Sequence, residues 1–400
     1  MDQLTPRLPS VANHSTAGRA LAPATRGASQ RTRPVVALAH DYLTQRGGAE
    51  RMMLSLLRAF PEAPLYTSVY EPESTYPEFG NYDVRTLWPN RIAALRQHHR
   101  RGLPIYQAAF SRLLIDAEAL ICSSSGFAHG ARTTGVKIVY CHTPSRWLYQ
   151  QADEYLAGWP RVLRAGARML APALRHTDRR QATTADLYLA NSAVVRERIA
   201  EAYGIDALVV PPPMTSFAVG TDHPVAGVVP GYLLCVSRLL TYKKVDVVIS
   251  AFAELPDHRL IVVGSGPEEE RLRAACPRNV ALLGHVDDAE LRWLYRNCAA
   301  VVSAAHEDFG LTALEAASCG KPAVVLEGAG FLDTVIDGKT GVFFPQPTAG
   351  SIVAAVRKAA ATTWDPEAIT DHAESFSEAS FAKRLHQAVA TTLEGRRPVS

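Results

Sequence analysis

The amino-acid sequence predicts an α/β protein with two doubly wound, Rossmann-like domains that face each other across a cleft. Three observations lead to this fold class: short buried strands alternate with helical segments, a proline-rich stretch interrupts them at residues 211–213, and the alternation then restarts. Of the 400 residues, 47% are hydrophobic and 20% are charged. This composition is typical of a globular protein and excludes a mostly disordered or collagen-like chain.

The first half begins with a segment that has no periodicity. Residues 1–33 are rich in Ala, Ser, Thr, Pro and Arg, so we expect a disordered tail there. The predicted N-terminal domain, residues 34–213, opens with a strand, a glycine turn and a helix. Its expected elements are strands at 35–41, 119–122, 137–141, 187–191 and 207–210, and a helix at 49–60.

A linker at residues 214–230 precedes the predicted C-terminal domain, residues 231–372. Its expected strands lie at 232–237, 259–263, 280–283, 299–303, 322–326 and 341–344, and its expected helices at 245–255, 268–276, 288–297, 311–319 and 351–360. The amphipathic stretch in residues 373–400 predicts a last helix that packs back on the N-terminal domain. Since doubly wound sheets bind ligands beyond the carboxyl ends of their strands, the chemistry is expected at those ends.

The formal net charge of +3 conceals two halves of opposite sign. Residues 1–215 hold 25 Lys+Arg and 17 Asp+Glu, a net charge of +8, whereas residues 216–400 hold 17 and 22, a net charge of −5. The basic side chains gather in two stretches, which are Arg91, Arg96, Arg100 and Arg101 with His98 and His99, and Arg161, Arg164, Arg168, Arg175, Arg179 and Arg180. Only Asp178 opposes the second stretch locally. Aromatic stacking platforms and nucleic-acid-binding motifs are absent, so we expect no nucleic-acid partner.

The second basic stretch also carries apolar residues at helical spacing: Trp159, Val162, Leu163, Met169, Leu170 and Leu174, with Pro172 as an expected kink. One interpretation is a helix that lies on an anionic membrane surface. The other is a helix whose apolar stripe packs on its own domain, with the arginines in water. The sequence leaves both open.

Two features bear on the cellular compartment. The six cysteines form no CxxC pair and mostly have apolar neighbours, which predicts reduced core thiols rather than disulfides or a metal site. No run of about 18 apolar residues predicts a spanning helix, and residues 1–33 lack the apolar core of a signal peptide. We therefore expect a cytoplasmic protein, with peripheral attachment to the inner face of the cell membrane as the further hypothesis.

The strongest constellation is a pair of glutamates in the second half. Glu307 follows a predicted strand, and Glu315 lies about one turn inside the next helix, so both carboxylates can face the cleft. Between them, the amides of Phe309, Gly310 and Leu311 are unpaired donors at a helix start, which suits phosphate or sugar hydroxyls. The alternative is that Glu307 and Asp308 only favour the positive end of the helix.

A second constellation follows the first strand of the same domain. Arg238, Lys243 and Lys244 stand where two or three cations can reach one anion, and a planar guanidinium fork with a compact ammonium suits a diphosphate. The alternative is a solvated loop with ordinary surface cations. Gly264-Ser265-Gly266 permits close backbone approach, but it lacks the remaining glycine of a dinucleotide fingerprint, which disfavours a nicotinamide oxidoreductase.

These motifs, in this order and at this spacing, resemble the retaining glycosyltransferases of family four, which have the two-domain fold called GT-B. The similarity covers residues 35–345 and includes Arg238 with Lys243, Glu307 with Glu315, Gly264-Ser265-Gly266-Pro267, Gly284-His285-Val286 and Gly338-Lys339-Thr340-Gly341. The first half adds His40-Asp41-Tyr42, Gly47-Gly48-Ala49-Glu50, Tyr140-Cys141-His142-Thr143-Pro144 and Asn191-Ser192. The sequence departs from mannosyltransferase-like relatives around Arg146-Trp147-Leu148-Tyr149, and Lys244 stands where glycine is common.

The resemblance implies roles for the matching residues. Arg238 and Lys243 would hold the donor diphosphate, Glu307 would contact the transferred sugar, and Glu315 would accept from the ribose hydroxyls. His142 would hydrogen-bond the donor sugar near the reacting carbon. The implied catalytic set is His142, Glu307, Arg238 and Lys243. The implied donor-binding set is Gly47, Gly48, Arg238, Lys243, Gly264, His285, Val286, Phe309, Gly310, Leu311 and Glu315.

The implied reaction moves a sugar from a nucleoside-diphosphate sugar to a hydroxyl of a saccharide or lipid-linked saccharide. GDP-mannose is the first expectation for the donor and a UDP-sugar the next, and no cofactor is implied. No Asp-x-Asp motif for a divalent metal occurs, so we expect activity without added metal. A nucleotide-sugar epimerase of the same fold and a non-catalytic nucleotide- or membrane-binding module remain as alternatives.

Overall fold

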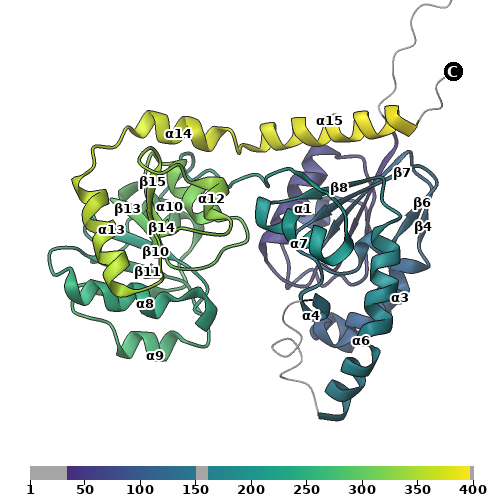
Figure 1. Cartoon of the computed structure of the whole chain (residues 1–400), viewed down its shortest axis with the longest axis horizontal. Helices are drawn as coiled ribbons and strands as arrows, with labels where there is room; N and C mark the ends of the chain where they lie inside the picture. The colour runs from purple at the N-terminus through teal and green to yellow at the C-terminus, as the bar shows by residue number, and fades with distance from the viewer. Residues whose placement is uncertain (1–33, 150–160, 397–400) are drawn as a thin grey trace, which may run out of the picture. The chain divides into compact units, whose positions relative to one another are not determined.

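The computed structural model describes residues 34–149 and 161–396, and it has two separate parallel sheets flanked by helices (Figure 1). Residues 35–400 belong to one compact unit. The predicted tail at residues 1–33 lies outside the described residues, as does Trp159 of the predicted apolar stripe. No described helix is both long enough and apolar enough to cross a membrane.

The first sheet has seven parallel strands in the order β3-β2-β1-β5-β7-β8-β9. Its central strands are buried along their whole length, which is why they consist of nearly continuous apolar runs. The strands are β1 (Val36–His40), β2 (Leu65–Thr67), β3 (Val84–Thr86), β5 (Ala119–Ser124), β7 (Val136–Cys141), β8 (Leu187–Ala190) and β9 (Leu208–Val209). A separate parallel pair joins β4 (Leu114–Ile115) to β6 (Arg132–Thr133).

The helices of this half connect and cover the strands. They are α1 (Gly48–Ala59), α2 (Ala93–Gln97), α3 (Leu103–Ser111), α4 (Arg146–Tyr149), α6 (Arg161–Ala182) and α7 (Ala193–Tyr203), with 3₁₀ turns η1 (Pro77–Asn81), η2 (Trp88–Arg91), η3 (His99–Gly102) and η4 (Ala128–Gly130). The ends of α7 follow from sequence: the Ser192 hydroxyl accepts from the Val195 amide, and Gly204 ends the helix at a φ of 70°.

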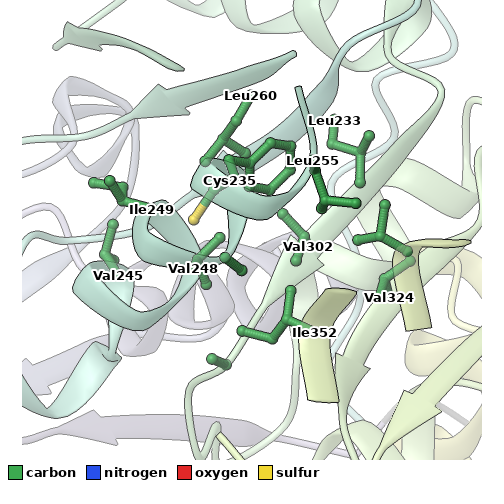
Figure 2. Close-up of a cluster of buried hydrophobic side chains, with 14 of the residues drawn as sticks. Leu233, Cys235, Val245, Val248, Ile249, Leu255, Leu260, Val302, Val324 and Ile352 are labelled. Atoms are coloured by element: carbon green, nitrogen blue, oxygen red, sulfur yellow. The ribbon is translucent and has the colours of Figure 1, made fainter. Parts of the chain in front are cut away.

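The second sheet has six parallel strands in the order β12-β11-β10-β13-β14-β15. They are β10 (Leu233–Val236), β11 (Leu260–Val263), β12 (Val280–Gly284), β13 (Ala300–Ser303), β14 (Ala323–Leu326) and β15 (Gly341–Phe344). One face packs on α8 and α13 through a cluster that includes Cys235, Val248, Val302 and Ile352 (Figure 2). Helices thus close the core of this sheet.

The helices of the second half are α8 (Val245–Ala251), α9 (Glu269–Ala274), α10 (Asp288–Asn297), α11 (Leu311–Ala317), α12 (Phe331–Thr334), α13 (Ala349–Ala361) and α14 (Pro366–Glu374), with 3₁₀ turns η5 (Thr241–Lys243) and η6 (Phe252–Glu254). The single helix expected at 245–255 is therefore two pieces, α8 and η6. The Asp287 side chain accepts from the amides at the start of α10, in a capping box with Glu290.

The last helix, α15 (Glu378–Arg396), contributes to the core of the first sheet. Phe381 and Leu385 are each 1% exposed and belong to the cluster that contains strands β1, β5 and β7. The Phe381 ring meets the Tyr140 ring edge-on at 5.8 Å between centroids. At the start of α15, Glu378 accepts from Arg58 of α1. The domain bounds that we predicted remain predictions.

Candidate functional site

A cavity of about 1170 Å³ is lined by residues that follow strands of both sheets. Eight of the residues that the sequence singled out line it: Gly48, His142, Arg238, Lys243, Glu307, Phe309, Gly310 and Leu311. Most of them follow the carboxyl ends of strands, where doubly wound sheets place their ligands.

Lys243 and Glu307 form a close charged pair in this cavity. The Lys243 ammonium lies 2.7 Å from both oxygens of the Glu307 carboxylate. Lys243 ends η5, which follows β10, and Glu307 follows β13; because these two strands are hydrogen-bonded neighbours, their carboxyl-end loops meet. The side chains are 12% and 24% exposed, so the pair faces the cavity without being open to bulk water.

Arg238 lies beside this pair. It is exposed, and its Nη2 donates to the Tyr242 hydroxyl at 3.1 Å. The Tyr242 ring is also 5.3 Å from the Lys243 ammonium, a cation–π contact. An anion that entered here would meet a guanidinium fork and an ammonium together.

The loop before α11 needs glycine at position 310. Gly310 has a φ of 84°, and a Cβ there would lie 2.6 Å from the Phe331 ring. This left-handed residue precedes the first turn of α11, where the N–H groups have no acceptor within the helix.

Glu315 lies on α11 but does not line the cavity. Its Oε2 accepts a hydrogen bond of 2.7 Å from the Tyr295 hydroxyl. Burial raises the pKa of Glu315 above its ordinary value, against the Tyr295 hydrogen bond and the charge of Arg51, which lower it. Its role toward a ribose stays a prediction.

Four other predicted donor-binding residues also lie outside the lining: Gly47, Gly264, His285 and Val286. A Cβ at Gly264 would lie 1.9 Å from the Ser237 carbonyl oxygen, so glycine there lets the loop after β11 pack against the backbone next to Arg238. A Cβ at Gly47 would lie 2.5 Å from the buried carboxylate of Glu50. These contacts give both glycines a packing role, and their contact with a donor remains untested.

His142 follows β7 and lines the cavity. Its Nε2 lies 3.0 Å from the Ser123 hydroxyl, and Asn191 donates to its carbonyl oxygen at 3.2 Å. Burial, together with the nearby His40, lowers the pKa of His142 from 6.5 to about 3, although the charge of Asp308 acts in the opposite direction. The imidazole is therefore neutral at physiological pH and can serve as a hydrogen-bond partner for a hydroxyl.

Sequence reasoning assigned no role in the cavity to several charged groups that line it. Asp308 accepts from Arg198 Nη1 at 2.6 Å and also from Arg146 Nη2. Arg51 of α1 lines the cavity and donates to the Thr215 hydroxyl at 3.0 Å. The Arg51 position, one residue after the Gly47-Gly48-Ala49-Glu50 motif, was a usable signal, whereas Arg198 looks like any surface cation of a helix.

The cavity carries more positive than negative charge. Its lining includes the cations Arg51, Arg146, Arg198, Arg238, Lys243 and Lys244 and the carboxylates Asp41, Glu307 and Asp308. Asp41 is 3% exposed and accepts from the amides of Ser125, Phe127 and Ala128, so it serves the fold of that loop. The net positive charge suits a diphosphate.

Comparison with known proteins identifies a family that part of the chain resembles. Residues 228–379 match the family model described as Glycosyl transferases group 1. A glycogen synthase of Mycobacterium tuberculosis is 36% identical over 138 residues, which cover 32% of this chain and 33% of that protein. A GDP-mannose-dependent alpha-(1-6)-phosphatidylinositol monomannoside mannosyltransferase of Mycolicibacterium smegmatis is 30% identical over 260 residues, which cover 52% of this chain and 65% of that protein. The chain thus spans between a third and just under two thirds of these relatives.

Solved structures extend the similarity of the fold to most of the chain. The lipopolysaccharide outer core galactosyltransferase WaaB in its apo form has a TM-score of 0.64 at 17% identity, over 89% of this chain and 99% of that one. The Anabaena protein HepE in complex with UDP has a TM-score of 0.65 at 17% identity, over 89% and 100%. The fold class and the family resemblance predicted from the sequence are confirmed: the protein has the GT-B fold, and its residues 228–379 match the family model of glycosyl transferases group 1.

Proposed function

We propose that the protein is a retaining glycosyltransferase. It moves a sugar from a nucleoside-diphosphate sugar to a hydroxyl of a saccharide or lipid-linked saccharide. The observation that carries the proposal is the pairing of Lys243 with Glu307, beside Arg238 and in one cavity with His142. Cations for a diphosphate and hydrogen-bonding groups for a sugar are thus available on one surface.

In this proposal the donor diphosphate binds to Arg238 and Lys243. Lys243 exchanges its carboxylate partner for a phosphate oxygen, and Glu307 then turns to the hydroxyls of the transferred sugar. Glu315 uses Oε1 for a ribose hydroxyl, because Oε2 already accepts from Tyr295. Fixed cations stabilise the charge that grows on the leaving diphosphate, which is the main electrostatic task of the reaction.

Transfer with retention is proposed to occur on one face of the sugar. The bond from the anomeric carbon to the diphosphate breaks, the acceptor oxygen forms the new bond, and the leaving phosphate receives the acceptor proton. Because His142 is neutral, it orients the sugar by hydrogen bonding and adds no positive charge to those of Arg238 and Lys243. Correct placement of acceptor and donor raises the rate further, because it replaces an encounter between two separate molecules.

A matched pair of lysine variants tests this assignment. Lys243→Ala should lower the rate of sugar transfer about 100-fold or more, the loss typical of a removed transition-state donor. Lys383→Ala on the exposed face of α15 is the control and should retain full activity. Glu307→Ala should also abolish transfer. Wild-type-like transfer by Lys243→Ala, or an epimerised nucleotide sugar formed without acceptor, would refute the proposal.

The donor is proposed to be GDP-mannose, with a UDP-sugar as the second candidate. The first choice is supported by the mycobacterial relative, whose name specifies GDP-mannose, and the second by HepE, which was crystallised with UDP. Thermal shift measurements with GDP, UDP, GDP-mannose and UDP-glucose distinguish them, since a ligand that binds only the folded state raises the apparent Tm. We expect the largest increase with GDP-mannose.

We also propose that catalysis needs no added metal, because Arg238 and Lys243 supply positive charge at the diphosphate. Transfer should then persist in excess EDTA. Loss of activity in the chelator, with recovery on addition of manganese, would overturn this part of the proposal and leave the transferase assignment intact.

Helix α6 supports a further proposal, that the protein attaches to the cytoplasmic face of an anionic membrane. Val162 and Met169 of this helix are 82% and 83% exposed, and Leu170 is 56% exposed. Asp178, which could have neutralised the neighbouring arginines, is instead buried against His129 and Tyr149. Exposed apolar side chains on a basic helix suit the headgroup region of an anionic bilayer.

Vesicle sedimentation tests the membrane proposal. The protein should sediment with vesicles of anionic phosphatidylglycerol and stay in solution with neutral phosphatidylcholine. Met169→Glu should weaken the binding, whereas Leu332→Glu, an equally apolar but distant exposed position on α12, should not. Equal sedimentation with both lipids, or no effect of Met169→Glu, would count against it.

A further inference from the structure

A chain of buried hydrogen bonds leads from the interior of the first sheet to His142. We propose that His40 and Ser123 are positioning residues that fix which ring nitrogen of His142 carries hydrogen, so that His142 presents an N–H to the cavity. The contact of that N–H with a sugar rests on the proposed function, whereas the state of the ring does not.

The geometry of the sheet brings the three side chains into line. Strands β1, β5 and β7 are parallel neighbours, and His40, the last residue of β1, is in register with Ser123 of β5. The Ser123 hydroxyl oxygen lies 2.9 Å from His40 Nδ1 and 3.0 Å from His142 Nε2. His40 is 2% exposed and Ser123 is fully buried, so water does not compete for these bonds.

Hydrogen counting couples the two imidazole rings. The Ser123 hydroxyl has a single hydrogen, so it donates to one of the two ring nitrogens and accepts from the other. One of the two facing nitrogens, His40 Nδ1 or His142 Nε2, therefore carries hydrogen and the other is bare. When both rings are neutral, the tautomer of His40 fixes the tautomer of His142.

The charge in the cavity selects between the two arrangements. Asp308 lines the same cavity as His142, so a carboxylate faces the space that this ring borders. A nearby carboxylate favours hydrogen on the nitrogen that does not face Ser123, which is Nδ1. The chain then runs from His40 Nδ1–H to the Ser123 oxygen, and from the Ser123 O–H to His142 Nε2.

The surroundings of His40, at the end of the hydrogen-bonded chain away from the cavity, are also polar and buried. Glu50, in the first turn of α1, is 1% exposed and interacts electrostatically with His40. One of its oxygens accepts from Gln45 at 3.0 Å, and the other has no hydrogen-bond partner among the described residues. The hydrogen-bonded chain therefore begins at His40, which interacts electrostatically with Glu50, and ends at the cavity.

Nitrogen NMR of the histidine rings tests the proposal without any substrate. Protein labelled with ¹⁵N-histidine is compared with Ser123→Ala, and His142→Gln assigns the His142 signals. In the wild type, Nε2 of His142 should have the shift of a bare nitrogen and Nδ1 that of a protonated one. In Ser123→Ala both shifts should move toward the average of two tautomers. A protonated Nε2 in the wild type, or shifts that Ser123→Ala leaves unchanged, would overturn the inference.

Kinetics provide the second measurement. Ser123→Ala should lower kcat about 10-fold, the effect expected when one buried hydrogen bond that orients the ring is lost, and should change the donor KM less than twofold. Ser123→Thr keeps the hydroxyl and should restore kcat. An unchanged kcat in Ser123→Ala would overturn the positioning role. If no donor supports transfer, the proposed function fails, and the NMR result still decides the state of the ring.

Discussion

The lowered pKa of His142 makes a quantitative prediction for stability. The ordinary pKa of the ring is 6.5, and in the folded protein it is about 3. Between these values the unfolded chain binds a proton that the folded protein does not bind. The contribution of His142 to the unfolding free energy is therefore fully present above pH 6.5 and is lost as the pH falls. Linkage gives a loss of about 2 kcal/mol between pH 7 and pH 5 from this one group.

The size of the effect is set mainly by the unfolded chain. At pH 5 the folded ring stays neutral for any pKa below about 4, so the result depends little on how far below that value the pKa lies. Since the ring is partly accessible from the cavity, solvent screening reduces the expected loss to about 1–2 kcal/mol.

Urea denaturation at pH 7 and pH 5 measures this loss directly. The wild type should lose about 1–2 kcal/mol more unfolding free energy between the two pH values than His142→Gln, which has no titrating ring. His176→Gln, on an exposed position of α6, controls for removal of an imidazole as such. Equal losses in the wild type and His142→Gln would refute the conclusion that burial keeps this ring neutral.

Three further predictions concern stability, each measured by urea denaturation. Lys244 has a φ of 55°, which favours glycine, so Lys244→Gly should raise the unfolding free energy by about 1 kcal/mol. Phe381→Ala should lower it by about 3–5 kcal/mol, because a fully packed ring is lost from the first sheet's core, and a change under 1 kcal/mol would contradict that packing. Gly264→Ala should lower it by several kcal/mol, since its Cβ would overlap the Ser237 carbonyl. Gly350→Ala, whose Cβ meets no atom within 4 Å, is the matched control and should be neutral or stabilising.

The sequence identified the parts of the fold that have strong local signals. Buried central strands such as β1 and β10 are short apolar runs, which the pattern of hydrophobic residues and the composition predict clearly. Strands β2 and β3, at one side of the first sheet, were missed because each has three residues and too little length to show a pattern. Helix α14 was missed as well, although Asp365 followed by Pro366 is a usable start signal.

The candidate site, like the fold, could be predicted only where the sequence carries local signals. Lys243 and Glu307 could be placed at the same edge of the sheet because each follows a predicted strand, but the ion pair between them was not predicted. Ser123 could not be found, since a serine within a buried strand carries no local mark of what lies opposite on the neighbouring strand. Its relation to His40 and His142 is set by the register of three strands, which tertiary structure alone determines.

The two acidic residues after β13 show how the charges in the cavity are paired. Glu307 is paired with Lys243, and Asp308 is shared by Arg146 and Arg198. A part-buried charge without a partner is costly, which is why Lys243, Arg146 and Arg198 are each paired with a carboxylate. In the proposed reaction, a diphosphate that binds Lys243 displaces Glu307 from the ammonium. In the proposed reaction this exchange couples donor binding to the presentation of Glu307, because the carboxylate becomes available for sugar hydroxyls only when the diphosphate is in place.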